Sequence, residues 1–137
     1  MLTDLGAYGN HVGATLAAKT GGQSAEDLAR LVDTLPDGCL GIDLDPGALI
    51  MSGYSPLELI EKVRAPILHV HARDGLRDRL AAAGEETPLG RGGVDFPAVL
   101  GALEDRTYRG YLTVQRNQAA DPQREIGYAI QYLRNLV

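Results

Sequence analysis

The sequence predicts an α/β fold in which parallel strands alternate with helices. Four apolar runs of strand length occur along the chain, and an amphipathic segment with helix-start signals follows each of them. Alternation of this kind is typical of parallel strands joined by crossover helices. With 137 residues the chain has the length of one domain, which we place at residues 1–137.

The four strands are predicted at 13–19, 39–45, 67–71 and 111–115. In each strand alternate residues are aliphatic, so one face is able to meet helices. In the third strand this alternation predicts that Leu68 and Val70 face the helices. It places Ile67, His69 and His71 on the other side.

Each predicted strand ends in a polar or charged residue on its other face. These residues are Lys19, Asp45, His71 and Gln115. Because sites in parallel α/β folds gather at the carboxyl ends of strands, we expect the four side chains to converge on one polar site. The two histidines of the third strand have a second explanation, namely a half-buried strand whose imidazoles are satisfied by neighbouring groups.

Helices are predicted after each strand, at 24–35, 55–63, 95–105 and 121–136. Each begins at a Ser or Asp that is able to cap the first turn, and an apolar stripe at helical spacing follows. Ser55 with Glu58 has the spacing of a capping box. The connection at 72–93 is long and rich in Gly and charge, so we predict a mobile loop of the kind that covers or forms a site.

Charge and composition argue against several classes of partner. The net charge is −5 and there is no basic block, which argues against nucleic acid and against an anionic membrane. No apolar run approaches the roughly 20 residues of a membrane span. Cys39 is the single cysteine, so an internal disulfide is impossible and a cytoplasmic location is expected.

Five ordered motifs give the chain a family resemblance. The motifs are LAAKTG, LGIDLDPGALI, ILHVHARDG, PLGRGGVDFPAVLGAL and YRGYLTVQRN. With these motifs in this order, the chain from about Leu5 to Leu136 resembles the C-terminal half of the xylose isomerase-like TIM barrel family, which includes sugar phosphate isomerases and epimerases and is related to apurinic endonucleases. The resemblance implies that the strands are the fifth to eighth of a (β/α)8 barrel, and that LTDLGAYGNHVG ends the fourth helix.

A half-barrel of this kind has two open strand edges, at 13–19 and 111–115. A complete barrel takes roughly 250 residues. Three explanations for the missing half are therefore open. The chain is truncated, a separate N-terminal half-barrel is its partner, or two copies form a homodimer.

The resemblance also implies a divalent metal, Mn, Mg or Zn, held by Glu, Asp, His and Glu at the ends of the four strands. It assigns Asp45 and His71 to the metal, and His69 and Arg77 to the substrate. The two Glu positions, which also serve as acid and base in the family, are occupied by Lys19 and Gln115.

These two replacements argue against ordinary metal binding and ordinary isomerase chemistry. A divalent cation prefers anionic oxygen ligands, whereas a Lys ammonium offers only hydrogen-bond donors. Lys19 either takes over the charge of the metal or reflects drift at an unused site. Arg116, beside Gln115, either binds a phosphate or substrate group or faces solvent.

The expected function is that of a sugar phosphate isomerase/epimerase-like protein that acts on a small sugar or polyol, weakly active or inactive alone. A non-catalytic, polyol-binding or self-associating half-barrel is the alternative. An apurinic endonuclease-type fragment is a third possibility, but the acidic charge and the lost metal ligands argue against it.

Overall fold

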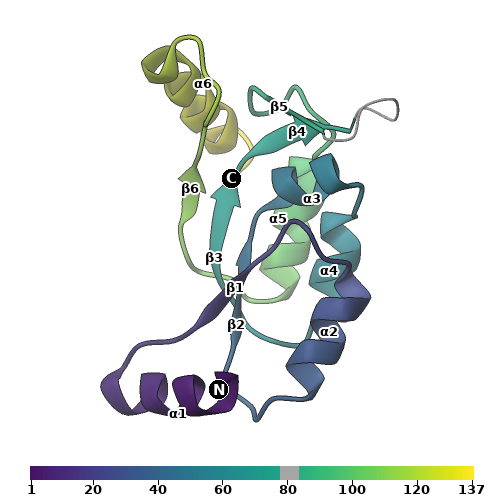
Figure 1. The fold of residues 1–137 in the computed structure, drawn as a ribbon. Helices are drawn as coiled ribbons and strands as arrows, with labels where there is room; N and C mark the ends of the chain where they lie inside the picture. Colours follow the sequence, from purple (N-terminus) through teal and green to yellow (C-terminus); the bar gives the residue numbers. More distant parts are fainter. Residues whose placement is uncertain (78–83) are drawn as a thin grey trace.

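The computed structural model describes residues 1–77 and 84–137, and a sheet of four parallel strands forms its centre (Figure 1). The elements follow in the order α1 (Leu2–Val12), β1 (Ala17–Lys19), α2 (Ala25–Asp33), β2 (Gly41–Leu44), α3 (Pro46–Ser52), α4 (Pro56–Lys62), β3 (Ile67–Ala72), β4 (Asp74–Leu76), β5 (Glu85–Thr87), α5 (Phe96–Asp105), β6 (Leu112–Val114) and α6 (Pro122–Arg134).

The predicted α/β fold with parallel strands is confirmed. The strand order is β1-β2-β3-β6, and each neighbouring pair is parallel. In Figure 1 the helices α2, α4 and α5 lie along one face of this sheet. The side chains between the two layers are mostly aliphatic, and Ile42, Leu44 and Val70 of the central strands are almost completely buried there.

The four predicted helices are confirmed, with ends within two residues of those expected. The predicted cap of each helix accepts a hydrogen bond from the backbone N–H three residues further on. These caps are Ser24, Ser55, Asp95 and Asp121. At α4 only half of the predicted capping box forms, because the Glu58 carboxylate pairs with Lys62 at 2.7 Å. Among the described helices, none is both long and apolar enough to cross a membrane.

Two structured parts of the chain were not predicted. The helix α3 begins directly after β2, with Asp45 as its cap and Pro46 as its first residue, and it ends at Gly53, whose φ is 84°. The segment predicted as one long loop contains the antiparallel hairpin β4–β5. Residues 78–83 of that segment lie outside the described residues.

A β-bulge corrects the predicted orientation of two side chains in β3. Ile42 pairs with Ile67, but the next pair is Asp43 with His69, so the register shifts by one residue at this point. Ile67 therefore packs against the core. Leu68 lies beside Gly41 on the open face of the sheet, which is the face away from α2, α4 and α5, and 38% of its surface is exposed. Beyond the bulge the prediction holds, with Val70 buried against the helices and His69 and His71 on the other face.

The position of α3 depends on a close approach of two backbones. A Cβ atom on Gly47 would lie 2.7 Å from the carbonyl carbon of Arg73 and 2.8 Å from the backbone nitrogen of Asp74. Only glycine allows the first turn of α3 to pack this closely against the connection between β3 and β4.

We predict that Gly47→Ala lowers the free energy of unfolding by about 2 to 3 kcal/mol, because backbone atoms must move to admit the methyl group. Gly101→Ala is the matched control. A Cβ at Gly101, which lies within α5, meets nothing within 4 Å. The control should be more stable by about 0.4 to 1 kcal/mol. Denaturant unfolding followed by circular dichroism measures both, and equal stabilities of the two variants would contradict the packing described.

Candidate functional site

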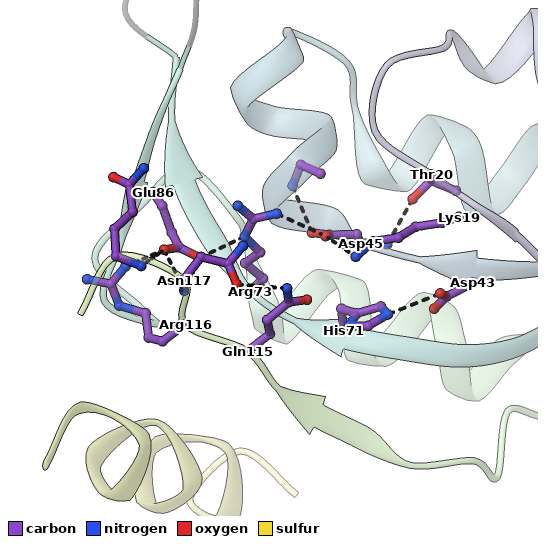
Figure 2. Close-up of polar contacts among 12 residues, drawn as sticks. Lys19, Thr20, Asp43, Asp45, His71, Arg73, Glu86, Gln115, Arg116 and Asn117 are labelled. Atoms are coloured by element: carbon purple, nitrogen blue, oxygen red, sulfur yellow. Dashed lines mark hydrogen bonds and ion pairs between the residues drawn. The ribbon is translucent and has the colours of Figure 1, made fainter. Parts of the chain in front are cut away.

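Asp45 is a completely buried carboxylate at the carboxyl end of β2, and two cations lie beside it (Figure 2). Its Oδ1 accepts the N–H of Ala48 at 2.8 Å, which is the cap of α3. Its Oδ2 lies 3.5 Å from Nζ of Lys19 and 3.3 Å from Nη1 of Arg73. The predicted approach of Lys19 to Asp45 is thus present, and the 47% exposure of the Lys19 side chain leaves its ammonium accessible from the open face.

Glu86, from the hairpin strand β5, is the centre of a larger charged network. Its side chain is 2% exposed and bonds to Nε of Arg73 and to Nη1 of Arg116, both at 2.7 Å. The backbone N–H groups of Asn117 and Gln118 also donate to it. Glu86 therefore fastens the loop after β6 to the hairpin that follows β3.

The network perturbs the pKa of its central carboxyl group. Burial by itself raises the pKa of Glu86, but the hydrogen bond from Arg73 and those from the N–H groups of Gln118 and Asn117 outweigh it and hold the pKa below its usual value. Glu86 is therefore ionised at neutral pH.

A second cluster lies on the open face of the sheet, where Asp43 contacts both histidines of β3. Nδ1 of His69 is 2.8 Å from Oδ1 of Asp43, and Nε2 of His71 is 3.0 Å from Oδ2. Nε2 of His69 is 2.7 Å from the hydroxyl of Thr113 on β6. One ligand-type atom from each of Asp43, His69 and His71 lies within 4.8 Å of the others, so these three residues are able to hold a metal ion.

Two buried polar atoms near the ends of β3 and β6 have no partner among the described residues. They are Nδ1 of His71 and Oε1 of Gln115. Gln115 uses its Nε2 to donate to Oδ1 of Asn117 at 3.0 Å, so its Oε1 remains free as an acceptor. Figure 2 shows both side chains in the region of Asp45 and Arg73.

The remaining predicted site residues have structural partners. Nη1 of Arg77 donates to the carbonyl of Ser52 at the end of α3. Arg116 is 8% exposed and is held between Glu86 and Glu125, each at 2.7 Å. Arg116 therefore faces neither solvent nor an open phosphate site in this arrangement, and a substrate role for Arg77 or Arg116 stays a prediction.

The residues at the strand ends do not fit the carboxylate-bound metal that the resemblance implies. Asp45 is the single carboxylate left in that ligand set, and both of its oxygens are engaged by an N–H group or a cation. Lys19 and Arg73 supply positive charge where a divalent ion would need anionic oxygen. The pairing of Asp45 with His71 as metal ligands has no supporting contact, since His71 bonds to Asp43 instead.

Comparison with known proteins agrees with the parallel α/β arrangement of the strands and helices. The family described as xylose isomerase-like TIM barrel matches residues 6–136. An inosose dehydratase of Clostridium perfringens is 29% identical over 90% of this chain and 44% of its own length. The structure of a xylose isomerase domain protein from Planctomyces limnophilus superposes with a TM-score of 0.85 at 28% identity, over 98% of this chain and 49% of that one.

A more distant structure shows the fold alone. The 3-keto-D-glucoside 4-epimerase of E. coli matches with a TM-score of 0.70 at 19% identity, over 98% of this chain and 51% of the epimerase. The chain thus spans about half the length of the proteins that it matches.

We predict that Glu86→Gln lowers the free energy of unfolding at pH 7 by roughly 3 kcal/mol, because it leaves two buried guanidinium groups without their shared carboxylate. Glu85→Gln is the control, since Glu85 is the exposed neighbour on the same strand, and it should change stability by less than about 0.5 kcal/mol. Urea unfolding measures both variants.

The effect of Glu86→Gln on the free energy of unfolding depends on pH, and the direction of this dependence follows from the lowered pKa of Glu86. The pKa of Glu86 is lowered in the folded chain, so its stabilisation is complete above the unfolded value, about 4.3. It is lost as the pH falls through the lower folded value. The stability difference between Glu86→Gln and the unaltered chain should therefore shrink below about pH 4, and a difference that stays constant into acid would contradict the ionised state of Glu86.

Proposed function

Because the chain belongs to the xylose isomerase-like TIM barrel family, we propose that it is the C-terminal half of a (β/α)8 barrel and binds a small sugar or polyol at the carboxyl ends of its strands. The parallel order β1-β2-β3-β6 and the half-length match to whole relatives support a half-barrel. The name of the inosose dehydratase supports a carbohydrate-like ligand. Under this hypothesis, residues 1–137 are one partial barrel domain.

The observation that carries the proposal is the set of polar groups at the strand ends. Lys19 offers N–H donors, while Nδ1 of His71 and Oε1 of Gln115 are buried polar atoms without a partner in the described part of the chain. A hydroxyl group is both donor and acceptor, so a polyol is able to satisfy such a set. An acceptor left unsatisfied costs about 1 to 3 kcal/mol, which favours a ligand or water at this position.

We further propose that the chain alone has weak or no isomerase or epimerase activity. Lys19 and Gln115 stand at the positions of the acid and base that the resemblance implies, and an amide cannot act as a general acid or base at neutral pH. Lys19 would supply the positive charge that the metal implied by the resemblance would bring. The non-catalytic, polyol-binding alternative is favoured by the same observation, since Asp45 is already neutralised by Lys19 and Arg73.

A complete barrel needs a partner for the two open edges, β1 and β6. We propose either a separate N-terminal half-barrel or a second copy of this chain. The open face beside these edges is apolar as well as polar, with Leu68 and Tyr111 exposed. An apurinic endonuclease-type role remains disfavoured by the net charge of −5, and a cytoplasmic location remains a prediction from the single Cys39.

The effect of Lys19 and Gln115 on metal binding is tested by replacing both with Glu. We predict that the double variant Lys19→Glu with Gln115→Glu gains saturable Mn²⁺ binding at the strand ends, because it removes one cation from Asp45 and adds two anionic oxygen ligands. The unaltered chain should show no Mn²⁺ binding that depends on Asp45. Titration followed by Mn²⁺ electron paramagnetic resonance measures the free ion in both.

The control carries the same change of charge away from the site, as Lys62→Glu with Gln131→Glu on the exposed surfaces of α4 and α6. Mn²⁺ binding by the control equal to that of the site variant would show a general charge effect. Stoichiometric Mn²⁺ on the unaltered chain, lost in Asp45→Asn, would show that Lys19 and Gln115 do not abolish the metal site.

A further inference from the structure

We propose that Asp43, His69 and His71 form a zinc site on the open face of the sheet, one step further into the strands than the ends where Asp45 lies. Neither Asp43 nor His69 belongs to the metal ligands implied by the family resemblance, and His71 would bind through the nitrogen that faces Asp43. This inference does not depend on the proposed sugar or polyol ligand.

The three side chains have the chemistry and spacing of a zinc site. Two imidazole nitrogens and one carboxylate oxygen are ligands that zinc accepts, and three protein ligands leave a fourth position open. Bonds of about 2.0 to 2.2 Å to zinc place tetrahedral ligand atoms about 3.3 to 3.6 Å apart. The two imidazole nitrogens lie 2.8 Å and 3.0 Å from the oxygens of Asp43, and one ligand atom from each of the three residues lies within 4.8 Å of the others.

The charge of Asp43 supports a cation at this position. Its side chain is only 19% exposed, and its ion-pair partners within residues 1–77 and 84–137 are the two imidazoles. Lys19 pairs with Asp45 instead. A partly buried carboxylate whose described partners are imidazoles, with no Lys or Arg beside it, favours a bound cation.

The surroundings also orient one ligand as zinc sites require. When Nδ1 of His69 binds a metal, its Nε2 carries the proton and is able to donate it to an acceptor. The hydroxyl of Thr113, 2.7 Å from that nitrogen, is such an acceptor on the neighbouring strand. A second partner of this kind fixes the tautomer and the ring orientation of a metal-binding histidine.

Zinc at this position would give the half-barrel a Lewis acid that is independent of the altered strand ends. The open coordination position would take water or an oxygen atom of a bound molecule. The site lies on the sheet face opposite the helix layer, where Lys19 and Leu68 are also exposed.

The test is zinc titration of the full chain by calorimetry, after removal of bound metal with a chelator. We expect one equivalent of zinc to bind. Asp43→Asn and His69→Gln should each weaken binding by at least about 100-fold. Thr113→Val should weaken it by about 10-fold, because it removes the hydroxyl that orients the His69 ring. His11→Gln is the control, because His11 is an exposed histidine on α1, and it should leave binding unchanged.

A spectroscopic measurement on the unaltered chain covers the case in which a variant fails to fold. Cobalt substituted for zinc should give the visible bands of a four-coordinate nitrogen and oxygen site without a thiolate band. No saturable binding, a thiolate band from Cys39, or binding that is indifferent to Asp43→Asn and His69→Gln would each overturn the proposal. None of these outcomes bears on polyol binding, which is measured without zinc.

Discussion

The parallel pairing of β2 with β3 is the constraint on which the rest of the structure depends. Because Leu44 pairs with Val70, Asp43 lies level with His69, and Asp45 is left at the strand end. The bulge at the start of β3 sets this register. A slip by one residue would turn the histidines toward the helices and Val70 toward solvent, so the same pairing secures both the core and the polar face.

Asp45 and Glu86 are buried carboxylates that lie beside cations, which explains how their charges are tolerated. Lys19 and Arg73 face Asp45, and Arg73 also bonds to the deeply buried Glu86. Isolated ions cost several kcal/mol each when buried, and only close partners offset this cost. Lys19 in place of a carboxylate therefore has a structural consequence: together with Arg73 it neutralises Asp45.

Sequence patterns predicted the features that depend on neighbours in the chain. Strand phases, helix caps and the ion pair of Lys19 with Asp45 follow from alternation, spacing and the parallel arrangement. Arg73 and Glu86 were missed because they meet across 13 residues through an unpredicted hairpin. The position of Leu68 was wrong because a bulge has no clear signal, although Gly41 opposite it was a clue to a close contact.

The two polar layers of the open face differ in what they are able to bind. At the strand ends the Asp45 carboxylate is surrounded by donors, so an added cation would meet repulsion from Lys19 and Arg73. One layer inward the donors are imidazoles, which become acceptors toward a metal when they are neutral. The replacement of carboxylates at the ends thus need not remove metal chemistry from this face. On the two proposals made above, metal binding is confined to the layer where His69 and Asp43 meet, and the strand ends are left to recognise hydroxyl groups directly.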